Sequence, residues 1–227
     1  MHFHLPKPIH GWREFIGEIA IVVIGVLIAI GAEEAVQTRH WKHLVDETQE
    51  SLNAQLLDSK FSSLMRIKYS ECFERQLDAL DKLIDLPNFP SDQYHTTGLF
   101  YTWDTSAWDA AIASGAVAHM RPELRQSYAD IFSLTSKIGA LDQQAFAAGQ
   151  GLLTLRYHKK LNDTSRDRLA EAIARSRSYD HMITLGSKEW LEASKRLNIG
   201  NLSAEDREEL AKPVACTLPG ATPDNRN

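Results

Sequence analysis

The sequence predicts an all-α protein in which a single transmembrane helix runs into a long stalk helix and an antiparallel helical bundle. Three observations lead to this prediction. One apolar run near the amino terminus, residues 19–32, carries no charged side chain. Apolar residues recur at helical spacing through most of the remaining chain, with no strand pattern of any length. No proline falls between Pro122 and Pro213, which a mostly helical segment explains easily.

Composition limits the architecture and the classes of function. The chain has 227 residues, of which 43% are hydrophobic and 24% are charged, and its formal net charge is −5. This length allows one ordinary domain with an appendage. The charge content excludes a solvated disordered chain, and the mild acidity argues against binding to nucleic acid. The predicted parts are a short amino-terminal segment (1–11), a transmembrane helix with interfacial flanks (12–41), a helical bundle domain (42–215) and a disordered tail (216–227).

The apolar run is the centre of the predicted transmembrane helix. As a helix it rises about 21 Å, less than the hydrocarbon core of about 30 Å, but apolar residues continue on both sides of it. Trp12 and Trp41 would lie about 43 Å apart in a helix, which matches a bilayer with its headgroups, where indole rings are favoured. A cleaved signal peptide and a soluble core helix are the alternatives. Glu14 and Glu18 argue against the signal peptide.

The basic residues on the two sides of this helix are nearly balanced. Lys7 and Arg13 on the amino side stand against Arg39 and Lys42 on the other. The positive-inside rule therefore gives only a slight preference for a cytoplasmic amino terminus. In a bacterium this orientation corresponds to a single-pass protein of the inner (plasma) membrane with its main domain in the periplasm.

One face of the predicted transmembrane helix carries mostly small residues at alternating spacings of three and four. Small residues let helix backbones approach closely in lipid, which favours packing against a second copy or another membrane protein. The alternative is composition alone, because Gly and Ala are common in such helices. Glu18, the ionisable member, either reaches the headgroups or makes a polar contact with a partner helix. The face consists of Glu18, Val22, Gly25, Ala29, Ala32 and Val36.

The helical pattern continues beyond the membrane segment. It stops only at Pro87, which predicts a stalk helix over residues 37–86 with one break near Ser59–Ser63. Residues 87–105 contain two prolines and no periodicity, and are expected to form an irregular connection.

Four further helices are predicted from their end signals. Capping-box sequences begin three of them, and a proline suited to the first helical position begins the fourth. Glycine or proline ends the two short helices. The first predicted helix starts at Ser106 and ends at Gly115, and the second runs from Pro122 to about Tyr157. The third starts at Thr164 and continues through Trp190, and the fourth starts at Ser203 and ends at Pro213.

Two blocks of the sequence resemble a bacterial family of single-pass membrane proteins of unknown function. They are GWREFIGEIAIVVIGVLIAIGAEEAV at 11–36 and AWDAAIASGAVAHMRPELRQSYADIF at 107–132. The most specific part is Gly17-Glu18 followed by the apolar stretch 23–29. The resemblance covers these blocks only. It implies an integral-membrane location and a helical domain, and it transfers no activity to any residue.

An aromatic-rich stretch lies at the end of the irregular connection. Its rings are expected to fold onto the end of the bundle, because aromatic side chains bury a large area. The alternative is a binding surface for a peptide or small ligand. The residues are Phe100, Tyr101, Trp103 and Trp108.

Basic residues cluster at the turn between the two long bundle helices. If the helix before the turn runs back antiparallel to the stalk, the turn faces the bilayer and contacts anionic headgroups. The alternative is a set of cations at a helix carboxyl end, which the helix dipole favours. The cluster consists of Arg156, Lys159, Lys160, Arg166 and Arg168.

The chain has two cysteines, Cys72 and Cys216, too few for a disulfide scaffold or a metal finger. In the periplasm they could form a disulfide that ties the tail to the stalk. The sequence alone favours two free thiols over this bond.

No pattern in the sequence indicates catalysis. His40, His43 and Glu47 share a helix face at metal-ligand spacing, but no second cluster completes a coordination sphere. No phosphate-binding loop, nucleophile elbow or HExxH sequence occurs. We therefore expect no metal, no cofactor and no enzymatic activity.

The functional expectation is a membrane-anchored helical interaction protein, an accessory subunit or scaffold. Its expected partners are the lipid bilayer and either a second copy of the chain or another membrane protein. The alternative is an extracytoplasmic ligand-sensing bundle that needs a separate signalling partner.

Overall fold

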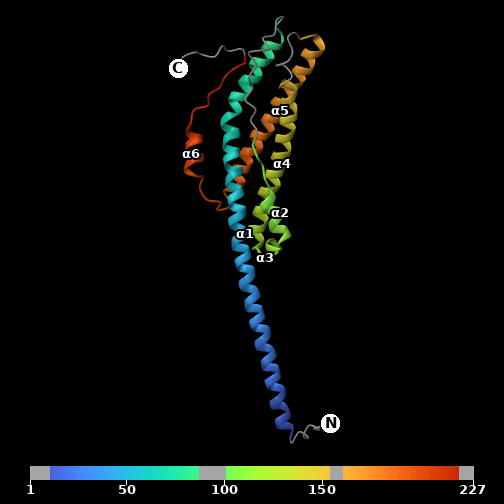
Figure 1. Ribbon diagram of the computed structural model, residues 1–227, viewed down its shortest axis with the longest axis vertical. Coiled ribbons are helices and arrows are strands. Elements are labelled where there is room, and N and C mark those ends of the chain that lie inside the picture. The colour runs from blue at the N-terminus through green and yellow to red at the C-terminus, as the bar shows by residue number, and fades with distance from the viewer. Residues whose placement is uncertain (1–10, 87–100, 154–160, 220–227) are drawn as a thin grey trace, which may run out of the picture. The chain divides into compact units, whose positions relative to one another are not determined.

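The computed structural model describes residues 11–86, 101–153 and 161–219. All regular structure in these ranges is helical: α1 (Trp12–Ile84), α2 (Ser106–Ala113), α3 (Ala116–His119), α4 (Pro122–Leu153), α5 (Asp163–Ser194) and α6 (Ala204–Ala211) (Figure 1). The chain divides into two compact units, Met1–Glu47 and Thr48–Asn227. The second unit contains the bundle, and the predicted all-α fold is confirmed.

Helix α1 is one unbroken helix of 73 residues. The predicted break near Ser59–Ser63 is wrong. The Ser59 hydroxyl donates to the carbonyl of Gln55 at 3.4 Å, so it is satisfied inside the helix. Ser59, Ser62 and Ser63 are all buried. These serines mark a face of α1 that packs inside the bundle.

Near the amino terminus α1 contains a long apolar segment. It is the one described helix that is long and apolar enough to cross a membrane. None of its most apolar 18-residue window is buried.

Helices α4 and α5 form an antiparallel pair. The Trp190 indole near the end of α5 donates to the Thr135 hydroxyl at 2.8 Å in the first half of α4. Near the end of α4, a Cβ added to Gly151 would lie 3.4 Å from Ala172 in the first half of α5. The close approach of the two backbones at this glycine keeps the pair in contact over most of its length.

Helix α4 runs parallel to the part of α1 that lies in the bundle. The Tyr128 hydroxyl, near the start of α4, donates to the Asn53 side chain at 2.8 Å. Leu152, near the end of α4, belongs to the same apolar cluster as Leu80 and Ile84 at the end of α1. Helix α5 is therefore antiparallel to both.

The length of the connection after α1 makes this arrangement possible. Along α1, Ile84 lies about 46 Å beyond Asn53. The 21 residues between Ile84 and Ser106 can span about 70 Å when extended. At the start of α2, the Gln55 side chain accepts from the Ala107 amide at 3.0 Å, which shows that the chain has returned to the level of residue 55.

Several predicted helix ends agree with the structure. The capping box at Ser203 forms, with the Ser203 and Asp206 side chains each bonding to the other's backbone amide. Pro122 is the first residue of α4. Gly115 follows the end of α2 with φ of 78°, a left-handed conformation that favours glycine. Pro213 follows the last residues of α6.

Two predicted capping boxes do not form. Ser106 is the first residue of α2, and the carboxylate of Asp104 accepts its amide at 2.9 Å. Helix α5 begins two residues earlier than expected, because Asn162 accepts the Ser165 amide at 2.8 Å. In both cases a side chain with a carbonyl or carboxylate oxygen, located just before the predicted serine or threonine, provides the cap.

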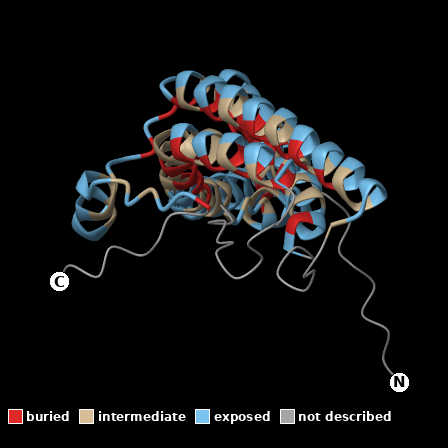
Figure 2. Cartoon of the chain, turned by 90° about the horizontal axis from the view of Figure 1, so that it is seen from above, coloured by how far each residue is buried: buried red, intermediate tan, exposed pale blue. Residues whose placement is uncertain are grey.

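The buried residues lie on the sides of the helices that face one another (Figure 2). Towards the end of α1 they form an apolar cluster with the end of α4 and the start of α5. This cluster contains Leu77, Leu80, Ile84, Leu152, Leu169 and Ile173. A second set of buried apolar residues lies towards the other end of the bundle, at Leu52, Leu56, Tyr128, Ile131, Phe132, Ile138, Ile183 and Trp190.

Residues 195–219, which we call the C-terminal strap, contain α6 and run along α1. Lys60 donates to the carbonyl of Gly200 at 3.4 Å, and Gln76 donates to the carbonyl of Thr217 at 2.8 Å. The sequence separation between the two residues of a pair is 140 for the first contact and 141 for the second. The strap therefore advances in the same direction as α1.

A disulfide joins the strap to α1. The sulfurs of Cys72 and Cys216 are bonded, and their Cα atoms are 5.5 Å apart. The pair thus adopts the disulfide alternative in place of two free thiols, because the strap carries Cys216 back to Cys72. Residues 216–219 were expected to belong to a disordered tail, but they are ordered here, and Pro219 is buried. Residues 220–227 lie outside the described part of the chain.

Candidate functional site

The most unusual feature of the bundle is a group of buried charged residues between its two apolar regions. Arg66 of α1, Asp142 of α4 and Asp180 of α5 are each only 2% exposed. The Arg66 guanidinium Nη2 lies 3.3 Å from Asp180 Oδ1. We call these three residues, together with the buried hydroxyls around them, the polar layer.

The positions of these residues on their helices place them inside. Asp142 follows Ile138 by four residues, and Asp180 lies between Ser176 and Ile183 at spacings of four and three. All of these neighbours are buried. The inward face of each helix therefore includes a carboxylate at a position where an apolar residue is usual.

Burial controls the protonation of both carboxyl groups. It raises the pKa of Asp180 to about 6, while the nearby Arg66 charge opposes the shift. It also raises the pKa of Asp142, again against the opposing effects of Arg66 and the Tyr101 backbone amide. Neither Asp142 oxygen makes a hydrogen bond of ordinary geometry with a described residue. Asp142 is thus a buried carboxyl group that has a weak contact with the Tyr101 backbone amide and no hydrogen bond of ordinary geometry with a described residue.

Hydroxyl groups lie within two helical turns of Arg66 and Asp180 on α1 and α5. Several of them are buried and have no hydrogen-bond partner within the described ranges. Such groups are rare inside proteins, because each loses its bonds to water on burial. They belong to Ser63, Ser176, Thr184 and Ser187.

The segment before α2 covers one side of the polar layer. Trp103 lies so close to α4 that a Cβ added to Gly139 would be 3.0 Å from the Trp103 Cβ. Burial raises the pKa of the Tyr101 phenol to about 12, although the charge of Arg66 partly counteracts this. Tyr101 and the guanidinium therefore share one environment.

The predicted aromatic stretch packs on the bundle. Trp108 stacks on Phe132 of α4, with ring centroids 5.6 Å apart and planes 11° from parallel. Tyr101 and Trp103 are partly buried against the same helix. These contacts agree with rings that fold onto the bundle. Phe100 lies outside the described residues.

The predicted basic turn does not meet the condition for facing a bilayer. That condition requires α4 to run antiparallel to the stalk, whereas α4 runs parallel to it. The Arg166 guanidinium donates to the carbonyl of Leu86 at 2.9 Å, so the start of α5 lies beside the end of α1. Arg168 is exposed. The other three members, Arg156, Lys159 and Lys160, lie outside the described residues.

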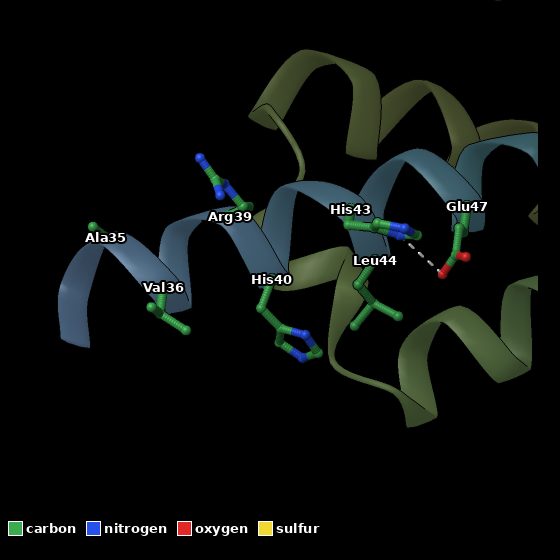
Figure 3. A pocket seen from close by; sticks show the side chains of 7 residues that line it. All are labelled: Ala35, Val36, Arg39, His40, His43, Leu44 and Glu47. Carbon is green, nitrogen blue, oxygen red and sulfur yellow. Dashed lines mark ion pairs between the residues drawn. The ribbon is translucent and has the colours of Figure 1, made fainter. Parts of the chain in front are cut away.

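His40, His43 and Glu47, which share metal-ligand spacing in the sequence, do not converge on one point. Figure 3 shows His43 turned towards Glu47, with Nδ1 and Oε2 3.3 Å apart, and His40 pointing away from both. Both partners of the pair are largely exposed. No group of three or more possible metal ligands occurs among the residues that the structure describes.

The small-residue face of the apolar segment is fully exposed. All six of its residues, from Glu18 to Val36, are exposed, and a Cβ added to Gly25 would meet nothing within 4 Å. Trp12 is also exposed, and Trp41 is partly buried. Packing on this face and the interfacial roles of the two tryptophans remain predictions.

Sequence reasoning missed the polar layer. The available signal was the presence of Arg66, Asp142 and Asp180 at positions in register with apolar residues. Ser63, one turn before Arg66, extends the same pattern, which was interpreted as a break in the helix.

Comparison with known proteins identifies no relative. No family model, no curated protein and no solved structure matches the chain. Functional inference must therefore start from the geometry of the two units.

Proposed function

We propose that this chain is a membrane-anchored helical interaction protein. Its apolar segment crosses the bilayer once, and it associates with a second copy or with another membrane protein without catalysing a reaction. One observation carries this proposal: none of the most apolar 18 residues of α1 is buried by the parts of the chain that the structure describes.

The exposed apolar area needs a cover. Ile21, Leu27 and Ile28 are 73%, 63% and 67% exposed. Burying one such side chain is favourable by roughly 1.5–3 kcal/mol, so a segment of this kind is very unstable in water. The exposed residues occupy all sides of the helix. A lipid bilayer covers all sides at once, whereas a soluble partner would cover one.

The continuity of α1 supports a retained anchor over a cleaved signal peptide. The helix passes from the apolar segment into the bundle without interruption. Cleavage after the apolar run would therefore cut the interior of a helix. The resemblance of the two sequence blocks to single-pass membrane proteins supports the same interpretation.

The disulfide supports a bundle outside the cytoplasm. Disulfides persist in oxidising compartments such as the periplasm and are rare in the reducing cytosol. Blocking free thiols in intact cells, followed by reduction and labelling, tests this placement. We expect Cys72 and Cys216 to be labelled only after reduction. Labelling before reduction would indicate a cytoplasmic bundle.

Self-association is tested by chemical crosslinking of the full-length protein in membranes. Gly25→Leu and Ala29→Leu enlarge the small-residue face and should reduce the crosslinked dimer. Ala20→Leu is the matched control, because at 100° per residue it lies on the opposite side of the helix. An equal dimer yield from all variants would contradict packing through this face.

The polar layer supports a second candidate function, a ligand-sensing bundle that acts through a separate signalling partner. Buried polar groups without partners are a common property of binding sites. Asp142 is the specific observation in its favour, because both of its oxygens are buried and neither makes a hydrogen bond of ordinary geometry with a described residue.

A further inference from the structure

We propose that the polar layer is a proton-binding site, in which the buried Arg66 charge balances one of the two carboxylates, Asp142 and Asp180, and the other carboxyl group binds a proton in the folded bundle. The stability of the bundle then depends on the pH of its compartment. This inference does not depend on membrane anchoring or on self-association, because it concerns the interior of residues 48–219 alone.

The charge balance of the layer requires an additional positive charge. Arg66 lies within 3.3 Å of Asp180, and this ion pair is almost completely buried. A second ionised carboxylate, Asp142, would leave an uncompensated negative charge in the same region. An isolated carboxylate is very costly to bury, so such groups usually take up a proton instead.

A proton also resolves the missing hydrogen bonds. An ionised carboxylate only accepts hydrogen bonds, whereas a protonated carboxyl group also donates one. Buried hydroxyls without a partner among the described residues, such as those of Ser63 and Thr184, occur on the same helices and can accept as well as donate. Protonation therefore removes the surplus charge and turns one carboxyl group into a donor as well as an acceptor.

A metal ion fits the layer less well than a proton does. Two carboxylates are too few to hold a cation, and a guanidinium already lies beside one of them. The described residues offer no third acidic, histidine or cysteine ligand in a common group. A proton needs neither further ligands nor a cavity.

The surrounding ionisable groups come from every helix packed around the layer. Arg66 lowers the pKa of both carboxyl groups, and the adjacent His181 lowers that of Asp180 when it is charged. Glu74 of α1 raises the pKa of Asp180. Burial outweighs the lowering effects for both carboxyl groups. The remaining groups that act on the layer, through Tyr101, are Tyr69 of α1 and Glu209 of α6.

The direction of the pH effect follows from the raised pKa values. The folded bundle binds a proton over a range in which the unfolded chain has already released it. The stabilising contribution is therefore fully present below the ordinary Asp pKa of about 4 and is lost as the pH rises through about 6. A shift of about two pKa units corresponds to about a 100-fold change in the folding equilibrium constant.

The test compares the full-length protein in detergent micelles with its Asp142→Asn variant. Unfolding by urea is measured at several pH values between about 4 and about 8. We expect the wild-type folding constant, divided by that of the variant, to fall as the pH rises over this range, because Asp142 loses its proton and the amide of the variant does not. His181→Gln is the control, because it removes the histidine beside Asp180 and leaves both carboxyl groups in place; it should retain the wild-type dependence. A ratio that does not change with pH would overturn the proposal.

A spectroscopic measurement covers the case in which Asp142→Asn does not fold. The infrared spectrum of the wild-type protein at about pH 5, where ordinary aspartates are mostly ionised, should contain the carbonyl band of a buried protonated carboxyl group. The band should disappear reversibly at about pH 8. Its absence at the lower pH would also overturn the proposal.

Discussion

Removal of the disulfide should strongly lower the free energy of unfolding. Cys72 and Cys216 close a loop with a sequence separation of 144. In the chain-entropy model a loop of this size stabilises the folded state by up to about 5 kcal/mol, because it restricts the unfolded chain. Cys216→Ser should therefore reduce the unfolding free energy by about 2–5 kcal/mol.

The measurement is unfolding of the full-length protein in detergent by guanidinium chloride, followed by far-ultraviolet circular dichroism. Cys72→Ser should give the same midpoint as Cys216→Ser, since either substitution removes the same bond. A reducing agent should lower the wild-type midpoint and leave both variants unchanged. The reasoning is refuted if the wild-type midpoint does not respond to the reducing agent, or if Cys216→Ser unfolds like the wild type.

Three further predictions test the packing of the bundle. Gly139→Leu should destabilise the protein in thermal unfolding, because a Cβ at this position would lie 3.0 Å from Trp103. Gly149→Ala in the same helix should stabilise the protein by about 0.5–1 kcal/mol, because a Cβ there meets nothing within 4 Å. Equal effects of the two substitutions would contradict this packing. Trp190→Phe should cost about 1–3 kcal/mol, because it removes a buried 2.8 Å hydrogen bond to a hydroxyl; an unchanged midpoint would argue against that bond. Tyr101 should ionise late in an absorbance titration, with a pKa of about 12. Because this pKa is raised, the neutral Tyr101 phenol should stabilise the fold fully below about pH 10, and this stabilisation should be lost as the pH rises through about 12. Tyr101→Phe should remove the late ionisation step from the titration.

The local features of the fold could be predicted from the sequence. The period of the apolar residues identifies the helices, and residues such as Pro122, Gly115 and Ser203 mark their ends, because caps depend on nearby residues only. At the starts of α2 and α5, where the predicted capping boxes do not form, the groups that accept the backbone amides are also close in sequence. Asp104 and Asn162 precede the expected serine or threonine by two residues and accept the amide instead.

The direction of the helices could not be predicted in the same way. The sequence pattern of α4 is the same whether it runs parallel or antiparallel to α1. The choice depends on contacts between distant residues, such as Tyr128 with Asn53 and Leu152 with Leu80. The long connection after α1 permits either direction, which is why the basic turn was assigned a position that the structure does not support.

The polar layer and the strap were missed for a different reason. A charged residue on a helix usually indicates the solvent side, so the register of Arg66 and Asp180 with apolar residues is only a weak signal of burial when each helix is considered alone. Their pairing emerges only when α1 and α5 are packed together. Likewise, Cys216 follows a proline-containing segment that is typical of a tail, and it is ordered by contacts with α1, among them the bond to Cys72 and the hydrogen bond from Gln76 to Thr217.

The most direct test of the proposed membrane anchor is extraction of cell membranes that contain the full-length protein. Washing with alkaline carbonate releases peripheral proteins and leaves integral ones in the membrane pellet. We predict that the wild-type chain stays in the pellet, and that a variant with Leu27→Asp and Ile28→Asp, which places two charges in the apolar segment, is released. Recovery of the wild-type protein in the soluble fraction would contradict the membrane anchor.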